Sequence, residues 1–389
     1  MRTRLSSRWL AVGESHHTVA RKAGVEAASR ALGQQGGKLL VVFGSCVYEP
    51  RELLDGIRSC SERIPVIGCS TRGEIATSGP GDAGVVVFAV GGGGFSVATS
   101  AATAAGGLRE AGAAAATCAS EVSDRRHRIL LMLTDGLAGD QREIVRGAYG
   151  VVGAEIPLVG GCAGADPKLG TTVQFHGDEV LSNAVVAATI GSDAPLGIGV
   201  HRGWRCVGEP MLVSATEANR VLTLDDEPAL DVYLRKLAAP SDATNDPAAF
   251  AHFAITHPLG LQRRSGEEVR AVTGADFADR SLVCAVEVPQ GGLTWFMEGD
   301  YESVLAATDL ACVKALHQLE GAAPLGFLAF DCIARRGVLG DAGAEQEVAR
   351  IARHAGGAPL AGFYTYGEIA RIHGTGGFYN QTLVVLAFA

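Results

Sequence analysis

Short runs of apolar residues recur along the chain, and each run ends on small or polar residues. Three of these runs lie at residues 39–43, 129–133 and 326–330. Apolar runs of about four to eight residues bounded by turn-forming residues are typical of buried β-strands. Each run is followed by apolar residues at helical spacing and then by another short apolar run. The pattern predicts a unit of strand, helix, strand, turn and strand that occurs at least three times.

The turn in this unit has a characteristic sequence that occurs twice with little change. Pro65–Ile75 reads PVIGCSTRGEI, Pro359–Ile369 reads PLAGFYTYGEI, and Pro157–Asp166 is a looser copy. Internal repeats indicate that one structural unit is used several times. We therefore expect segments 38–90 and 324–388 to adopt the same motif. A further strand is predicted after each copy, at residues 85–90, 185–190 and 383–388.

The remaining pattern predicts the elements around these units. Helical periodicity predicts helices over residues 16–32, from about residue 141, and over residues 301–319. His176-Gly177-Asp178 is typical of a hairpin turn, residues 253–255 suggest a short strand, and the polar stretch 238–247 predicts a surface loop or linker. The expected fold class is mixed α/β, with two related halves whose sheets are flanked by helices. We place the domains at residues 1–220 and 221–389.

Composition and charge limit the function classes. The chain has 389 residues, 47% of them hydrophobic, and a net charge of −9, which argues against nucleic acid or an anionic membrane as the main partner. No apolar stretch reaches the roughly 18 residues that a membrane span requires. The nine cysteines form no CxxC pair, so neither a zinc ribbon nor a disulfide framework is indicated. A reducing, cytoplasmic location is expected.

Cys332 is a candidate reactive thiol because it follows a predicted strand and precedes Arg335 and Arg336. Guanidinium groups near a thiol lower its pKa and favour the thiolate. The alternative is that Cys332 is a small buried residue at a strand end, where cysteine is common. Covalent catalysis would also need a positioned base, and no histidine neighbours Cys332 in the sequence.

Arg335 and Glu368 follow neighbouring predicted strands, so both are expected at one rim of the sheet. A guanidinium can hold a carboxylate at two points, and a glutamate can hold an ammonium group, so the pair suits a free amino acid. The alternative is that the two side chains pair with each other or cap the turn. Glu74 occupies the same place in the first copy, and this repetition favours a structural role for Gly-Glu-Ile. Tyr364 and Tyr366 alternate with Thr365, so they are expected to face one side and line a pocket or pack together.

These motifs together resemble the FIST family, a two-part sensory module of bacterial signalling proteins. The resemblance rests on segments from about residue 38 to the C-terminus, namely 66–75, Asp135-Gly136, 203–208, 228–230, 332–335, 362–369 and Asn380-Gln381-Thr382. Membership implies a sensor that binds a small ligand, with amino acids as the proposed class, and some members are haem-based nitric oxide sensors. The chain carries no kinase, cyclase or methyl-accepting output domain, which predicts a separate signalling output protein as partner.

The leading function is therefore a non-enzymatic sensor of a small polar metabolite. The predicted ligand-binding residues lie in the C-terminal half, namely Cys332, Arg335, Tyr364, Tyr366, Gly367, Glu368 and Asn380. No cofactor or metal is predicted as the first choice. Haem binding is the second hypothesis, with His16, His17, His201, His252, His257 and His373 as candidate axial ligands. An enzyme that uses Cys332 is the third.

Overall fold

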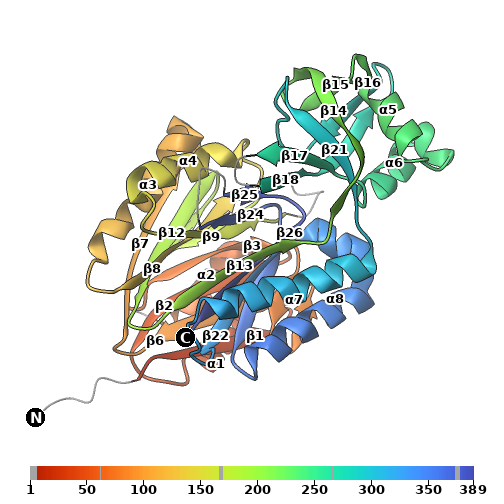
Figure 1. The fold of residues 1–389 in the computed structure, drawn as a ribbon. Coiled ribbons are helices and arrows are strands. Elements are labelled where there is room, and N and C mark those ends of the chain that lie inside the picture. Colours follow the sequence, from red (N-terminus) through yellow and green to blue (C-terminus); the bar gives the residue numbers. More distant parts are fainter. Residues whose placement is uncertain (1–6, 62, 166–169, 264–265, 373–376) are drawn as a thin grey trace, which may run out of the picture.

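A computed structural model describes residues 7–61, 63–165, 170–263, 266–372 and 377–389 of the chain. Figure 1 shows a body of sheets with helices on its outside and a smaller, β-rich domain that projects from one side. The body contains three sheets of six strands each, and the projecting domain contains one further sheet. The predicted mixed α/β fold class is confirmed.

One order of elements occurs three times in the body: strand, helix, strand, helix and four strands. The first repeat comprises β1 (Trp9–Ser15), α1 (Ala20–Ala31), β2 (Gly37–Ser45), α2 (Pro50–Arg58), β3 (Val66–Thr71), β4 (Glu74–Ala76), β5 (Gly79–Gly81) and β6 (Val85–Gly91). The second comprises β7 (Phe95–Thr103), α3 (Leu108–Ala115), β8 (His127–Asp135), α4 (Gln141–Val152), β9 (Leu158–Ala163), β10 (Gln174–His176), β11 (Glu179–Leu181) and β12 (Ala184–Ser192). The third comprises β13 (Leu196–Arg202), α7 (Tyr301–His317), β22 (Gly326–Cys332), α8 (Ile333–Ala355), β23 (Leu360–Thr365), β24 (Glu368–Arg371), β25 (Phe378–Tyr379) and β26 (Thr382–Phe388). The predicted unit is confirmed, and the structure adds a strand and a helix before it.

The three sheets have the same strand order, and each is completed by a hairpin from another repeat. The orders are β1-β6-β2-β3-β10-β11, β7-β12-β8-β9-β24-β25 and β13-β26-β22-β23-β4-β5. The first repeat thus gives its hairpin to the third sheet, the third gives its hairpin to the second, and the second gives its hairpin to the first. This cyclic exchange joins the three repeats into one body.

The inner faces of the three sheets meet in a shared apolar core. Central strands place alternate residues on the inner face, such as Phe43 on β2, Leu133 on β8 and Phe330 on β22. Phe43 stacks on Phe363 with ring centroids 5.0 Å apart, which joins the first and third sheets. The outer faces of the same strands are covered by two helices each, so these strands are buried on both sides. Burial on both faces explains why they appear in the sequence as continuous apolar runs.

A glycine on the strand after each helix is required by close packing of the backbone. Gly68, Gly160 and Gly362 occupy the same register position in the three parallel strand pairs. A Cβ atom at these positions would lie 2.5, 1.9 and 1.9 Å from a carbonyl oxygen of the neighbouring strand. Such distances leave no room for a methyl group, so the glycine of the repeated turn sequence is fixed by sterics.

The projecting domain is inserted into the third repeat, between β13 and α7. It contains β14 (Arg205–Glu217), β15 (Arg220–Leu224), β16 (Glu227–Pro228), α5 (Ala229–Lys236), α6 (Pro247–Ala254), β17 (Leu259–Arg263), β18 (Gly266–Arg270), β19 (Val272–Asp276), β20 (Ser281–Cys284) and β21 (Leu293–Glu298). The domain boundary predicted at residues 220 and 221 falls in β15, inside this single sheet. In space, therefore, the chain divides into three repeats and an insertion.

Several individual elements can be compared with the sequence predictions. The helices expected over residues 16–32, from residue 141 and over 301–319 form as α1, α4 and α7, and the hairpin at His176–Asp178 forms as β10 and β11. The strand expected at residues 253–255 is wrong, because Phe253 and Ala254 belong to α6. This helix begins at Pro247, and the Asp246 side chain caps it by accepting a hydrogen bond from the Ala248 N–H.

The repeat glycines lead to a stability prediction. We expect Gly362→Ala to lower the free energy of unfolding by on the order of 3 kcal/mol or more, because its Cβ would overlap the Ala329 carbonyl oxygen. The matched control is Gly150→Ala in helix α4, where the site is exposed and a Cβ meets nothing within 4 Å. That change should stabilise the protein by about 0.5–1 kcal/mol. Chemical denaturation of both variants tests this, and equal effects at the two glycines would contradict the steric account.

Candidate functional site

Glu74 and Glu368 hold the turn that starts each exchanged hairpin. The Glu74 carboxylate accepts hydrogen bonds from the Thr71 hydroxyl and from the Gly84 N–H, the latter at 3.0 Å. Glu368 accepts from the Thr365 hydroxyl at 2.5 Å and from the Thr382 N–H at 3.1 Å. In the second repeat Gln174 takes the same place, and its Oε1 accepts from the Ala184 N–H at 3.2 Å. The structural interpretation of Gly-Glu-Ile therefore fits the geometry, and Glu368 is occupied within the turn.

Arg335 lies in the first turn of helix α8 and belongs to a buried ion-pair network. Its side chain is 0% exposed; its Nε donates to Asp331 at 2.7 Å, and its Nη2 pairs with Glu347 and donates to the Thr308 hydroxyl at 3.0 Å. Burial and the neighbouring Glu347 carboxylate raise the pKa of Asp331 well above its usual value, and the Arg335 guanidinium opposes this shift. The expectation that Arg335 is available to a ligand carboxylate does not fit this geometry, because its charge is already matched inside the protein.

Cys332 is buried at the end of β22 and does not have the environment of a reactive thiol. Burial, followed by the nearby Glu368 carboxylate, raises the pKa of Cys332 well above its usual value. Arg335 was expected to lower this pKa, but its guanidinium is directed at Asp331 and Glu347 instead. The geometry thus favours the alternative in which Cys332 is a packing residue.

Tyr364 and Tyr366 lie in different parts of the core. Tyr364 is fully buried beneath α8, with the Arg336 guanidinium 4.8 Å from its ring centroid. Tyr366 packs at the edge of the second repeat's core and donates to the Ala165 carbonyl at 2.6 Å. The expectation that both tyrosines face one side is therefore wrong, because the strand β23 ends at Thr365 and the chain turns.

The other two predicted ligand residues are part of the same turns. Gly367 has a φ of +151°, and a Cβ there would lie 2.4 Å from the Phe378 ring, so this position requires glycine. Asn380 is buried in the turn before β26, where its main-chain carbonyl accepts a hydrogen bond from the Thr382 hydroxyl at 3.0 Å. Neither residue is among those that line the cavities described below.

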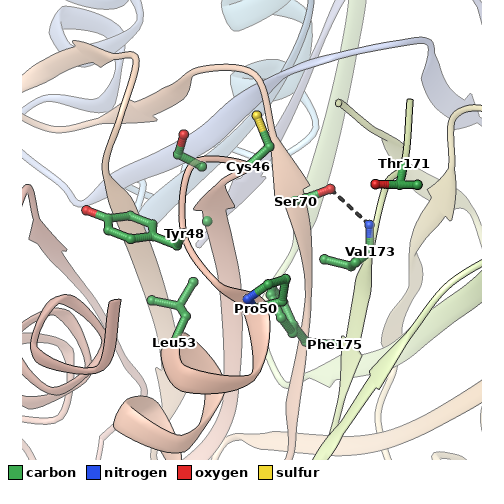
Figure 2. A pocket seen from close by; sticks show the side chains of 10 residues that line it. Cys46, Tyr48, Pro50, Leu53, Ser70, Thr171, Val173 and Phe175 are labelled. Atoms are coloured by element: carbon green, nitrogen blue, oxygen red, sulfur yellow. Dashed lines mark hydrogen bonds between the residues drawn. The ribbon is translucent and has the colours of Figure 1, made fainter. Parts of the chain in front are cut away.

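A cavity lies at the corresponding strand ends of the first repeat, in the N-terminal half of the chain. We call it the first-repeat pocket, and Figure 2 shows its side chains. It has a volume of about 180 Å³ and is lined by Gly44, Ser45, Cys46, Tyr48, Pro50, Leu53, Ser70, Thr171, Val173 and Phe175. The first seven of these come from the first repeat. Thr171 and Val173 come from the segment that leads into the exchanged hairpin of the second repeat, and Phe175 lies on the first strand of this hairpin, β10.

The internal hydrogen bonds of this pocket keep its two sides together. The Ser70 hydroxyl donates to the Gly164 carbonyl at 2.9 Å. It accepts from the Val173 N–H at 3.0 Å, and Figure 2 shows this second bond. The Ser45 hydroxyl donates to the Asp82 carbonyl, and the Tyr48 hydroxyl to the His17 carbonyl at 2.9 Å. These hydroxyls shape the pocket. The half-buried Cys46 and the exposed Thr171 present the remaining polar side-chain groups.

The same place is filled by larger side chains in the other two repeats. Register equates Gly44 with Thr134 and Asp331, and Ser70 with Cys162 and Tyr364. In the second repeat the Thr134 hydroxyl donates to the buried Gln141 side chain at 2.8 Å. In the third, Asp331 and Tyr364 are buried beneath α8, beside Arg335. The small residues of the first repeat therefore leave the space that the other two repeats fill.

This pocket was not predicted from the sequence, although the two turn copies contain the signal for it. The expected pocket lay instead at the aromatic residues Tyr364 and Tyr366 of the later copy. In the fold, the large side chain at position 364 fills the space beneath its helix, whereas Ser70 and Gly44 leave it open. The informative difference was thus the loss of side-chain volume in the first copy.

Comparison with known protein families matches most of the chain to two family models. A model of the FIST N domain matches residues 38–227, and a model of the FIST C domain matches residues 229–371. The chain belongs to the FIST family. This membership supports a role in sensing and signal transduction, and it confirms the resemblance seen in the sequence.

Similar chains occur in mycobacteria. An uncharacterized protein of Mycobacterium tuberculosis is 24% identical over 394 residues, which cover 97% of this chain and 99% of that protein. An uncharacterized protein of Mycobacterium bovis is 26% identical over 237 residues, which cover 59% of this chain and 60% of that protein. In the part of this FIST chain that the structure describes, no helix has the length and apolar character needed to cross a membrane.

The two turn glutamates of this FIST protein predict a pH dependence of stability. Burial raises the pKa of Glu74 from 4.5 to about 7 and that of Glu368 to about 8. Between pH 4.5 and these values the folded protein binds protons that the unfolded chain has released, so the free energy of unfolding falls as the pH rises. Glu74→Gln places the side chain of Gln174 in the first repeat and keeps the turn. It should reduce the fall in the free energy of unfolding at high pH by on the order of 3 kcal/mol.

Chemical denaturation at pH 5 and pH 9 measures this effect. The Glu74→Gln variant should equal the wild type within error at pH 5 and exceed it at pH 9. Glu110→Gln, at an exposed position in α3, is the matched control and should change neither value. If the free energy of unfolding of Glu74→Gln differs from that of the wild type by the same amount at pH 5 and at pH 9, the buried carboxyl does not titrate as proposed.

Proposed function

We propose that this FIST protein senses a small polar metabolite, which binds in the first-repeat pocket. The observation that supports this proposal is the difference between three equivalent places in one fold. Two of them contain buried side chains, and the third contains a cavity bounded by small residues. A space that its two counterparts fill is a candidate for occupation by a ligand.

The size of the pocket limits the ligand. Pockets that enclose drug-sized molecules have volumes of about 300–1,000 Å³, and this one has about 180 Å³. The volume suits a molecule of the size of a small amino acid. It is too small for a haem, and none of the ten lining residues is a histidine. We therefore place no haem in this pocket.

The lining favours a ligand with an apolar part and a polar end. Tyr48, Leu53 and Phe175 supply apolar contact, while Cys46 and Thr171 supply a thiol and a hydroxyl. None of the ten lining residues carries a charge. A charged group on the ligand is therefore expected at the mouth, near the exposed Thr171, where water can solvate it. Small amino acids with short apolar side chains are the first class to test.

Ligand binding here would act on the exchange between repeats. One wall of the pocket belongs to β3 and α2, and the other belongs to the strand that the second repeat adds to the first sheet. A ligand between these walls contacts both repeats and stabilises their association. We propose that a separate signalling output protein reads this change, because the described residues form only the three repeats and the insertion.

The two other hypotheses receive less support from the geometry. Candidate haem ligands are dispersed: His201 lies at the end of β13, His252 lies on α6, and His373 is outside the described residues. Cys332, the proposed nucleophile, is buried with a raised pKa. The cytoplasmic location remains a prediction from the sequence.

A ligand screen with one blocking variant tests the proposal. The wild type is screened against amino acids and small hydroxy and amide metabolites by thermal shift, and stabilising compounds are measured by calorimetry. Cys46→Phe places a ring in the pocket and should abolish binding, because Figure 2 shows Cys46 at the pocket wall. Val47→Phe is the matched control. Val47 follows Cys46 in the sequence, but its side chain is 63% exposed and does not line the pocket.

Binding should be unchanged in Val47→Phe and lost in Cys46→Phe, while both variants keep the wild-type circular dichroism. Alkylation of Cys46 should slow in the presence of the same ligand. The proposal is wrong if a stabilising ligand binds Cys46→Phe with wild-type affinity. It is equally wrong if the ligand does not slow the alkylation of Cys46 in the first repeat.

A further inference from the structure

A second cavity lies where the inserted domain joins the body. We call it the joint pocket; it has a volume of about 240 Å³, and its walls include His201, Arg202, Trp204, Lys314 and Tyr379. His201 and Arg202 end strand β13, Trp204 starts the insertion, Lys314 lies on α7, and Tyr379 lies on β25. The pocket thus combines residues of the third repeat with the first turn of the inserted domain.

The charge of this pocket is opposite to that of the whole protein. The chain has a net charge of −9, whereas three of the seven lining residues are Lys, Arg or His and none is acidic. Burial lowers the pKa of His201, and the charges of Lys314 and Arg202 lower it further. The Glu268 carboxylate on β18 raises the pKa of Tyr379, whereas Arg202 lowers it. The negative charge of Glu268 thus partly offsets the positive charge of Arg202 at this side of the pocket. The remaining surplus of positive charge lies on Lys314.

Hydrogen-bond donors are concentrated in the same place. The Trp204 side chain is 5% exposed, and its indole Nε1–H has no partner among the described residues. A buried donor without a partner is energetically unfavourable, so its presence indicates a missing acceptor. The Lys314 ammonium donates only a long bond of 3.4 Å to the Val200 carbonyl. The His201 ring donates through Nδ1 to the Arg202 carbonyl at 2.8 Å.

The packing around Trp204 connects this pocket to the insertion. Trp204 belongs to a small core with Val269 and Met297 of the inserted domain and Val304 and Leu305 of α7. The chain leaves the body at Trp204 and returns beside it at Gly299, where an added Cβ would lie 3.2 Å from the indole Nε1. A ligand that contacts Trp204 therefore contacts the joint itself.

We propose that the joint pocket binds a small organic oxyanion, a carboxylate or a phosphate monoester, held by Lys314 and the Trp204 indole N–H. The anionic group satisfies the buried indole donor and the ammonium group, and the Trp204 and Tyr379 rings contact the organic part. This site is separate from the first-repeat pocket. It gives the protein a second ligand, an organic anion, which binds where the insertion meets the body.

Calorimetry on the full chain, with inorganic phosphate and phenyl phosphate as probes at constant ionic strength, tests this site. Lys314→Ala should weaken binding about tenfold or more, since it removes one charged hydrogen bond. Trp204→Phe keeps an aromatic ring, removes the N–H donor and should also weaken binding. Lys236→Ala, on α5 of the insertion, is the matched control and should bind as the wild type does.

Two further readouts place the anion and separate the two sites. Wild-type tryptophan emission should change on titration, and this change should disappear in Trp204→Phe. Cys46→Phe should bind the anion normally, so a failure of the first-repeat proposal leaves this one unaffected. The inference is overturned if the wild type binds neither probe at millimolar concentration. It is also overturned if Lys314→Ala and Trp204→Phe both bind with wild-type affinity, or if Cys46→Phe abolishes binding.

Discussion

The exchange of hairpins between repeats is the constraint on which the rest of the structure depends. Each repeat leaves its own sheet before the turn glutamate or glutamine, which starts the first of the two strands that it adds to a neighbouring sheet. No repeat can complete a six-stranded sheet without another, so the three repeats fold as one body. The exchange also explains the two residues that the turn requires. Glycine allows the close approach of neighbouring strands, and glutamate or glutamine holds the start of the departing hairpin.

Equivalent positions in the three repeats make differences between them informative. Where a residue serves the turn, it is kept or replaced by a close analogue, as for Glu74, Glu368 and Gln174. Where residues face the outer helix, they differ in volume, from Gly44 and Ser70 to Asp331 and Tyr364. The third repeat uses this space for a buried ion-pair network, which costs desolvation energy and stabilises only as a complete set. The first repeat leaves it as a cavity.

The sequence was sufficient to predict the repeated unit, because strands buried on both faces are continuous apolar runs and the turn requires a fixed glycine and glutamate. It was not sufficient to predict the exchange, since the partner of a three-residue strand such as β4 depends on contacts 280 residues apart. The inserted domain was also missed, because its short strands carry weak periodicity. Cys332 ends β22 and Tyr364 lies near the end of β23, whereas Arg335 belongs to the first turn of α8. The sequence does not show that all three are buried.

The central claim is that, of the three equivalent strand-end places, the first repeat is the one that holds a ligand. The most direct measurement is a crystal structure of the full chain soaked with a mixture of small amino acids and hydroxy metabolites. The account predicts ordered ligand density between Cys46, Ser70 and Phe175, with Tyr364 and Gln141 still occupying the corresponding space in the other repeats. Density beneath α8 beside Arg335, with Tyr364 displaced and the first-repeat pocket unoccupied, would contradict it.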